Sequence, residues 1–413
     1  MRKGARRQME QEVYWLWLAA CRGLGSRGIE HLLAQLGSPE EIYRSPAGAY
    51  RGVKGLSRAA LHALEDKSLD GVRRTLEQCG RENIRLIALD SPRYPQRLRA
   101  ISSPPVVLYC RGSLPDTDRE ASVAVIGARR CSPYGERMAR LLAGDLARAG
   151  CVVVSGLAYG IDTAGIEAAL SEGGQVLAVL GCGVDVVYPR QNRELYERVA
   201  RQGALVSEYP PGTRPMAAYF PARNRIISGM SAGVALVEGR AVGGGMITVN
   251  LALEQGREVF AVPGPADCEL SDAPNRLIRE GSAKLVLSAG DILEELPPML
   301  CEGLRPIEPR AAHAPSRQPE EAPEGPARAQ GGQRAVDNGT GKAYIDWRSQ
   351  KSRLTDYQTA ILEMLEQGPK LADDLVDALE LPVRQVLSAL TVLQIEGFVQ
   401  DEGAGMYGVR RRA

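Results

Sequence analysis

Short runs of apolar residues alternate, between residues 121 and 287, with segments in which apolar residues recur every three or four positions. The runs are typical of buried strands and the periodic segments of amphipathic helices. Continuous apolar strands joined by helices predict a parallel sheet covered on both faces, which is a Rossmann-like doubly wound α/β fold. The expected strands are Val123–Ile126, Cys151–Val154, Val176–Leu180, Ala204–Val206, Val234–Val237, Val259–Val262 and Leu285–Leu287.

Residues 10–79 show helical periodicity instead, interrupted by glycine-rich turns at 23–25 and 52–55. A hydrophobic residue between glycines ahead of a helix resembles helix-hairpin-helix units, which bind DNA phosphates through backbone amides. A plain helical bundle with tight turns explains the same pattern equally well. Two further strand candidates connect these helices to the predicted sheet, at Ile84–Leu89 and Val106–Cys110.

After residue 300 the chain changes character twice. Residues 303–351 are rich in Pro, Ala, Gly, Glu, Gln and Arg, which is typical of a flexible linker. Residues 354–409 show three helical patterns and then two apolar pairs around a glycine turn, which predicts a winged-helix module. The expected organisation is a helical domain over 1–83 (SAM-like or helix-hairpin-helix-like), an α/β domain over 84–300, a disordered linker over 301–352 and a winged-helix domain over 353–413.

The charge of the tail argues against duplex reading by the winged helix. Between residues 352 and 409, three Lys or Arg oppose ten Asp or Glu, a net charge of −7, and the three arginines at 410–412 reduce this only to −4. Neutralising DNA phosphates requires the opposite sign. We therefore expect this domain to contact protein rather than duplex DNA.

Composition narrows the function classes further. The net charge is +1, so any site for a polyanion must be local. No apolar run reaches the roughly 18 residues that a membrane-spanning helix needs, and eight cysteines without C-x-x-C spacing indicate reduced thiols in a cytoplasmic protein. His31, His62 and His313 all lie outside residues 121–300, which argues against histidine triads and most metal centres in the largest domain. We expect no metal and no cofactor.

The candidate chemistry begins at residues 123–135, where a predicted strand, a turn and a helix start follow one another. Gly127 turns the chain, and Ser132, followed by proline, has the pattern of a helix N-cap. Free amides and the helix dipole favour an anion at such a helix start, and Arg129 and Arg130 lie in the turn. We interpret the turn as a phosphate site for a nucleic-acid strand.

Two common nucleotide-binding motifs do not fit this turn. The dinucleotide fingerprint needs three glycines and an acidic residue at the end of the second strand, but only Gly127 is present and that strand ends in Ser155-Gly156. A P-loop needs a lysine, and none occurs between residues 121 and 283.

Ligands of parallel sheets bind at the carboxyl ends of the strands, so the loops there hold the other candidates. Phe220 lies within five residues of Arg223 and Arg225, which supplies the aromatic face and cations that a single nucleic-acid strand needs. The alternative is a core phenylalanine beside arginines that cap or pair with a helix. An enzyme would use the carboxylates at these strand ends as acid and base, which makes a nucleotide or nucleoside hydrolase the alternative function, with Asp162, Asp185, Glu208 and Glu238 as its candidates.

A series of motifs between residues 94 and 282 resembles the DNA-processing protein A family (DprA, also called Smf). The matching stretches are Tyr94-Pro95 through Gly112, Gly127-Ala128-Arg129 with Ser132 and Tyr134-Gly135, residues 155–162 (SGLAYGID), Gly183 to Asn192, Ser207 to Pro210, Phe220 to Ile227, Gly244-Gly245 to Thr248, Val262-Pro263-Gly264 and Asn275 to Ser282.

The resemblance implies a cytoplasmic, homodimeric mediator and no enzyme. Such a protein would bind and protect single-stranded DNA and load a RecA-type recombinase during natural transformation and homologous recombination. The dimer would form through the carboxyl-terminal part of the α/β domain. With the strand-end loops, the candidate nucleic-acid-binding residues are Gly127, Arg129, Ser155, Gly156, Tyr159, Arg190, Phe220, Arg223, Asn224, Arg225 and Gly244.

The chain departs from the family pattern at four positions. Ala128 replaces a hydroxyl residue, Tyr159 stands where a basic residue is common, Ile166 replaces a histidine, and Gly243 begins a turn that usually reads S-G-[ST]. Arg129 and the 220–225 cluster are retained, so we expect the function to persist with an altered affinity.

Overall fold

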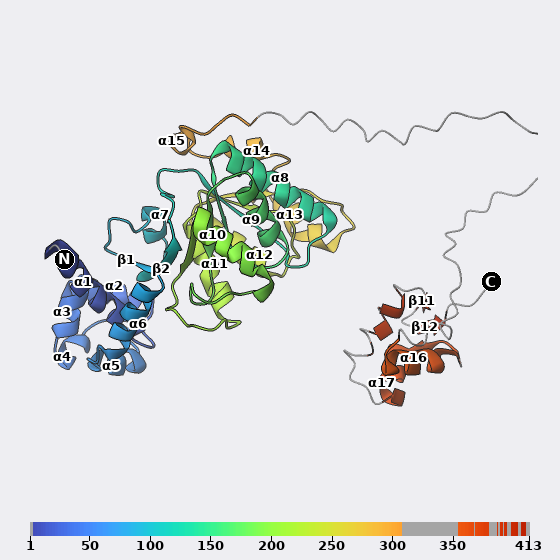
Figure 1. Cartoon of the computed structure of the whole chain (residues 1–413), viewed down its shortest axis with the longest axis horizontal. Coiled ribbons are helices and arrows are strands. Elements are labelled where there is room, and N and C mark those ends of the chain that lie inside the picture. Colours follow the sequence, from blue (N-terminus) through green and yellow to red (C-terminus); the bar gives the residue numbers. More distant parts are fainter. Residues whose placement is uncertain are drawn as a thin grey trace, which may run out of the picture. The chain divides into compact units, whose positions relative to one another are not determined.

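The computed structural model describes residues 3–307, 354–366, 368–379, 386, 389–390, 392–394, 398–403 and 406–409. Residues 3–307 belong to one compact unit and the carboxyl-terminal residues to a second (Figure 1). The first unit is built on a nine-stranded sheet in the order β1-β2-β6-β5-β4-β3-β7-β8-β9. Its strands are β1 (Arg85–Ala88), β2 (Val107–Gly112), β3 (Ser122–Ile126), β4 (Val152–Ser155), β5 (Val176–Val179), β6 (Ala204–Ser207), β7 (Gly233–Leu236), β8 (Glu258–Ala261) and β9 (Lys284–Leu285).

The seven predicted strands are confirmed, each with bounds within two residues of those expected. Along the order β6-β5-β4-β3-β7-β8-β9, all neighbouring strands pair in parallel. A crossover connection brings the chain back to the edge of the sheet at which the previous strand began, so that the next strand runs in the same direction. The two connecting strand candidates also join this sheet, since β2 pairs antiparallel with β6 and β1 with β2.

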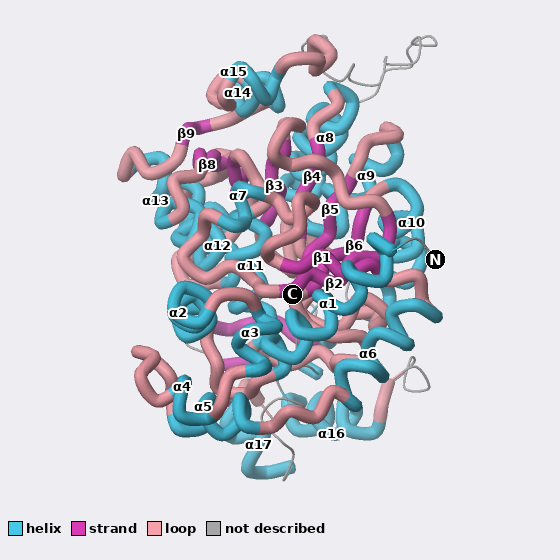
Figure 2. Tube along the Cα trace, turned by 90° about the vertical axis from the view of Figure 1, so that its left-hand side faces the viewer, coloured by secondary structure: helices cyan, strands magenta, loops and turns pink. Residues whose placement is uncertain are grey.

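Helices cover both faces of the sheet, which confirms the doubly wound fold (Figure 2). Val123 and Val125 point to the face that packs α8 (Pro133–Ala149), α9 (Ile161–Ser171), α10 (Arg193–Gln202) and α14 (Ala289–Leu293). Ala124 and Ile126 point to the other face, which alternation along a strand requires. That face packs α7 (Gln96–Arg99), α11 (Tyr219–Gly229), α12 (Gly244–Glu254) and α13 (Asp272–Arg279).

The amino-terminal helical segment packs into the same hydrophobic cluster as the first of these faces. Tyr50 is fully buried in it, and its hydroxyl donates to the carbonyl of Ile42 at 2.5 Å. The six helices are α1 (Lys3–Ala20), α2 (Ser26–Leu36), α3 (Pro39–Arg44), α4 (Ala47–Tyr50), α5 (Arg58–Glu65) and α6 (Asp70–Arg81).

Residues 301–307, the first part of the linker predicted over 301–352, are described by the structure and contact the α/β domain. The short helix α15 (Pro298–Cys301) is followed by ordered contacts, because Arg305 N donates to Ala149 O at 2.8 Å. From residue 308 to 353 the predicted linker lies outside the described residues.

Among the described residues, the second unit has two of the helices and both strands of the wing predicted for a winged helix. A three-stranded antiparallel sheet has the order β10-β12-β11. Its hydrophobic core, shared with the helices, contains the buried residues Leu362, Leu375 and Phe398. Most of the expected third helix, Pro382–Ile395, lies outside the described residues. The described elements are α16 (Asp356–Glu366), β10 (Lys370–Leu371), α17 (Ala372–Leu379), β11 (Val399–Gly403) and β12 (Met406–Val409).

The eight cysteines all lie within residues 3–307 and are free thiols, five of them buried. Among the described helices, none is both long enough and apolar enough to span a bilayer.

Candidate nucleic-acid interface

A cleft of about 670 Å³ lies at the carboxyl ends of β3, β4 and β7. One wall is the turn after β3, residues 127–130, and the opposite wall is the loop after β7 with the start of α12, residues 239–245. Residues of α11, among them Phe220 and Asn224, complete the lining. The cleft occupies the edge at which ligands of parallel sheets bind.

The helix start that the sequence indicates as the phosphate site is already occupied by a carboxylate of the protein. Ser132 caps α8 as predicted, accepting a hydrogen bond from Gly135 N at 3.1 Å. The buried Glu238 carboxylate, just after β7, accepts from Ser132 N at 2.9 Å and also from its hydroxyl. Glu238 therefore already supplies the anion that the start of α8 favours, and the predicted phosphate site is reduced to the turn with Arg129 and Arg130.

Gly127 is required for close packing of the turn. A β-carbon at this position would lie 2.7 Å from Ile161 Cγ1 and 2.8 Å from Glu238 O, closer than carbon atoms approach. Ala128 N donates to that same carbonyl at 2.8 Å. The turn is thus held against β7 and α9, and its two arginines are left on the rim of the cleft.

Arg129 is the exposed cation of the cleft that lies against an aromatic ring. Its guanidinium carbon lies 5.5 Å from the centre of the Phe220 ring, within cation–π range. Tyr188 packs on the same ring at 5.3 Å, and Gly181 lies under it, where a β-carbon would be 3.0 Å from Phe220 Cδ1. Phe220 is therefore not a core residue but a partly exposed ring fixed by its neighbours.

Tyr159 and Arg190 extend this surface. Tyr159 is 40% exposed, donates its hydroxyl to Gln191, and shares a small hollow with Arg129, Tyr188 and Phe220. Arg190 is exposed one residue beyond Pro189, at the start of a short 3₁₀ turn. Exposed aromatic faces beside cations are the features with which proteins bind unpaired strands.

Arg223 lines the floor of the cleft but is almost completely buried there. It is 3% exposed, and Nη1 donates to Gly156 O at 2.9 Å and to Val179 O. Burial lowers the pKa of Arg223 to about 10, and the nearby buried carboxylate of Asp162 opposes this shift. A direct phosphate contact, as the sequence suggests, is not available to a guanidinium in this position.

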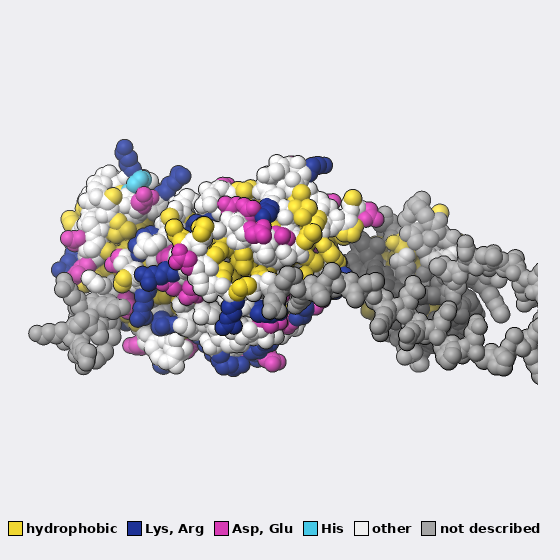
Figure 3. Space-filling model, turned by 90° about the horizontal axis from the view of Figure 1, so that it is seen from above, with side chains coloured by type: hydrophobic (Ala, Val, Ile, Leu, Met, Phe, Trp, Pro, Cys, Tyr) yellow, Lys and Arg dark blue, Asp and Glu magenta, His cyan; other side chains and the backbone are white. Residues whose placement is uncertain are grey.

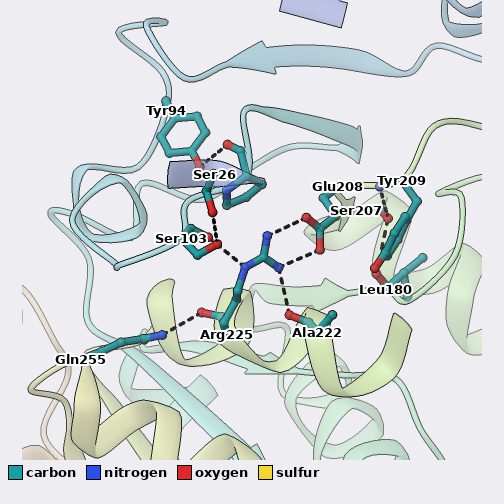
Figure 4. A network of polar contacts seen from close by, with 11 residues as sticks. Ser26, Tyr94, Ser103, Leu180, Ser207, Glu208, Tyr209, Ala222, Arg225 and Gln255 are labelled. Atoms are coloured by element: carbon teal, nitrogen blue, oxygen red, sulfur yellow. Dashed lines mark hydrogen bonds and ion pairs between the residues drawn. The ribbon is translucent and has the colours of Figure 1, made fainter. Parts of the chain in front are cut away.

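Arg225 is also committed to the protein, as Figure 4 shows. Its guanidinium pairs with both oxygens of Glu208, at 2.7 and 2.6 Å, and Nε donates to Ser103 O at 2.8 Å. The Ser103 hydroxyl hydrogen-bonds to that of Ser26 at the start of α2, so the arginine connects α11 with β6 and the helical domain. We expected Arg225 to bind DNA, but these contacts give it a structural role instead.

Replacing Arg225 with alanine should lower the free energy of unfolding by about 2 kcal/mol, because the Glu208 carboxylate would lose its bidentate partner in a largely buried site. Urea denaturation followed by circular dichroism measures this change. The matched control is Arg73→Ala, which removes an exposed ion pair with Asp70 and should change stability by less than about 0.5 kcal/mol. Equal stabilities of the two variants would contradict the structural role.

The remaining candidates divide between the cleft and its support. Asn224 lines the cleft and donates from Nδ2 to Gly244 O at 3.3 Å, which fixes the first turn of α12. Gly244 is exposed there, and its helix has no side-chain cap. Ser155 and Gly156 are buried: the serine hydroxyl donates to Val125 O, and a β-carbon on Gly156 would meet the Arg223 guanidinium at 2.6 Å. These two do not reach the surface.

The four carboxylates that could serve a hydrolase are each engaged in backbone or ion-pair contacts. Asp162 accepts from Gly156 N at 3.0 Å, and burial raises its pKa. Asp185 accepts from the amide of residue 212 at 2.8 Å, while Glu208 and Glu238 hold Arg225 and Ser132 as described. Of these four carboxylates only Asp162 lines the cleft, and it is buried there.

Comparison with known proteins identifies this architecture. Residues 85–297 match the family model described as DNA recombination-mediator protein A, and residues 348–405 match the DprA winged helix domain. The chain belongs to the DprA/Smf family. The DNA processing protein DprA of Bacillus subtilis is 41% identical over 224 residues, which cover 54% of this chain and 75% of that protein.

Two further relatives come from Streptococcus pneumoniae. Its DNA processing protein DprA is 45% identical over 206 residues, covering 49% of this chain and 71% of that protein. An X-ray structure of DprA from the same organism superposes with a TM-score of 0.62 at 33% identity, over 69% of this chain and 98% of that one.

Some cleft residues of this DprA/Smf protein are absent from the sequence-based set. Tyr188 packs on Phe220, and Arg240 lines the wall opposite Arg129. Both follow predicted strands, which is the signal that could have identified them. Ile166, at the position where the resemblance led us to expect a histidine, is fully buried in α9 and does not line the cleft.

Proposed function

We propose that this DprA/Smf protein binds single-stranded DNA in the cleft and acts as a mediator rather than as an enzyme. The observation that carries the proposal is the exposed Arg129 guanidinium lying on the Phe220 ring at the rim of the cleft. A phosphate can pair with the cation while a base stacks on the neighbouring aromatic faces. Arg130 and the uncapped amides of α12 provide further contacts for the backbone along the two walls.

We also propose that the protein protects incoming single strands and loads a RecA-type recombinase during natural transformation and recombination, in the cytoplasm. The family description as a recombination mediator supports this role. Stacking and phosphate pairing hold a strand without making or breaking covalent bonds in it. A strand that is passed on to a recombinase has to stay intact in this way. The engagement of all four strand-end carboxylates disfavours the hydrolase alternative.

We further propose a homodimer formed through the carboxyl-terminal part of the α/β domain. Hydrophobic side chains gather on the face that Figure 3 shows. β9 is an edge strand, and exposed apolar side chains concentrate in this part of the chain at Leu253, Leu285, Leu287 and Met299. Such side chains are typical of an association surface.

The mediator role is tested by nuclease protection and strand exchange. Full-length protein should shield a long single strand from an exonuclease and shorten the lag of strand exchange by a RecA-type recombinase on strands coated with single-strand-binding protein. Turnover of the DNA or of a nucleoside substrate would contradict the proposal, as would protection without any effect on strand exchange.

Deleting residues 352–413 should change the affinity for a single strand less than about threefold, because the acidic tail domain cannot neutralise phosphates. Fluorescence anisotropy with a labelled oligonucleotide measures this affinity. If the deletion abolished single-strand binding, the binding site would lie in residues 352–413 and not in the cleft.

A further inference from the structure

The strand β1 forms an open edge of the nine-stranded sheet. It is first in the strand order, lies next to the helical domain, and among the described strands pairs only with β2 (Figure 1). Leu89 N donates to Val106 O at 2.9 Å, so the register places the next bonded pair two residues earlier, at Ile87. Because bonded and outward-pointing residues alternate along an antiparallel strand, the backbone groups of Leu86 and Ala88 point away from β2.

The outward-pointing backbone groups of β1 are available to a further strand. Ala88 O accepts from Ser91 N at 2.9 Å, in the turn that follows β1. Among the described residues, no hydrogen bond is made by the N–H and carbonyl of Leu86 or by the N–H of Ala88. Unpaired N–H and carbonyl groups on an edge strand are a template for pairing with another chain.

A groove of about 680 Å³ lies along this edge of the sheet. One wall comes from α6, where Leu76 and Gly80 line it, and the other from the segments before α7 and after β2, with Tyr94 and Leu114. The two walls continue the two faces of the sheet, since Leu76 packs on the hydrophobic cluster of the first face and Leu114 on that of the second. A strand placed in the groove therefore has apolar side chains on both of its sides.

The groove carries more negative than positive charge. Within residues 3–307, three carboxylates and two guanidinium groups line it, those of Glu12, Asp116, Asp118, Arg85 and Arg93. The guanidinium of Arg85 donates a hydrogen bond to the carbonyl of Gly112, and the exposed carboxylate of Asp116 forms a long ion pair of 3.9 Å with Arg119. A DNA backbone requires the opposite charge, so the groove is matched to a peptide that carries a lysine or an arginine.

We propose that this groove binds an extended segment of a partner protein, which joins the sheet beside β1. The segment pairs its backbone with Leu86 and Ala88, packs apolar side chains on the two walls and directs a basic side chain to Asp116. Main-chain hydrogen bonds give such strand addition its affinity, and the side-chain contacts give it specificity. The groove shares no lining residue with the cleft, so the inference goes beyond single-strand binding and can hold or fail without it.

Two variants of the full-length protein test the groove. Gly80 is exposed in the last turn of α6 and a β-carbon there meets no atom within 4 Å, so Gly80→Trp adds a ring to the groove without disturbing the fold. Gly71→Trp is the matched control, because Gly71 is also exposed on α6 but does not line the groove. Leu86→Pro removes the outward-pointing N–H and keeps the pairing with β2, as proline on an edge strand allows.

The probe is a phage-displayed library of random heptapeptides, selected on immobilised wild-type protein and then measured as labelled synthetic peptides by anisotropy. Selected peptides should contain apolar residues with a lysine or arginine, and should lack proline. They should bind Gly71→Trp as they bind the wild type and lose measurable affinity for Gly80→Trp. Leu86→Pro should bind them at least about fivefold more weakly, since one main-chain hydrogen bond is lost.

Methylating the amide nitrogens of the best peptide one at a time separates strand addition from side-chain contacts alone. Only every second position should weaken binding, because alternate amides of the added strand face β1. Weakening at consecutive positions would overturn the inference, and so would equal binding of the peptides to Gly80→Trp and Gly71→Trp. Loss of self-association in Gly80→Trp, measured by analytical ultracentrifugation, would also overturn it, because a second copy of this chain would then occupy the edge.

Discussion

Replacing Phe220 with alanine is expected to weaken single-strand binding by about tenfold to a hundredfold, since stacking of one base on an aromatic ring contributes about 1–3 kcal/mol. The ring also supports Arg129 and packs against Tyr188, so its loss frees both neighbours. Anisotropy with a long oligonucleotide measures the change.

The control Phe220→Tyr keeps the aromatic face and should retain an affinity within about threefold of the wild type. A salt series adds a second criterion, because Arg129→Ala should lower the salt slope by about 0.7 while Phe220→Ala leaves it nearly unchanged. Equal affinities for wild type and Phe220→Ala would place the bases elsewhere.

Replacing Arg223 with methionine is expected to lower the free energy of unfolding by about 3 kcal/mol. The substitution keeps an unbranched apolar stem in place of the aliphatic part of arginine but leaves the buried Asp162 carboxylate without a nearby cation. The carbonyls of Gly156 and Val179 also lose their donor. Urea denaturation at neutral pH measures the change.

Arg129→Met is the matched control, since the same replacement on the exposed rim should alter stability by less than about 0.5 kcal/mol. Replacing Arg223 therefore tests stability, and replacing Arg129 tests single-strand binding. A stable Arg223→Met protein with a reduced salt slope for single strands would restore Arg223 as a direct phosphate contact.

The strands of the α/β domain are predictable because local pattern suffices for them. Val123–Ile126 and Val234–Val237 are continuous apolar runs, and burial on both faces of a parallel sheet selects such runs. The addition of β1 and β2 is less predictable, because β2 pairs antiparallel with β6 through residues as distant as Tyr109 and Ser207.

The position of the site could be predicted from the sequence, but its individual contacts could not. The strand-end rule locates the cleft, and both Arg129 and Phe220 lie in it. Glu238 lies 106 residues from the serine it binds, so no local pattern shows that the start of α8 is occupied. Arg223 and Arg225 stand two residues apart, yet one is buried in the floor of the cleft and the other pairs with Glu208; helical geometry and packing decide this.

The most direct test of the account is one binding experiment at low ionic strength with single-stranded DNA, duplex DNA and a mononucleotide. Wild-type protein should bind the long single strand most tightly, fail to retain the mononucleotide, and lose the preference for the single strand when Arg129 and Phe220 are both replaced by alanine. Single-strand binding that survives this double replacement would contradict the assignment of the cleft.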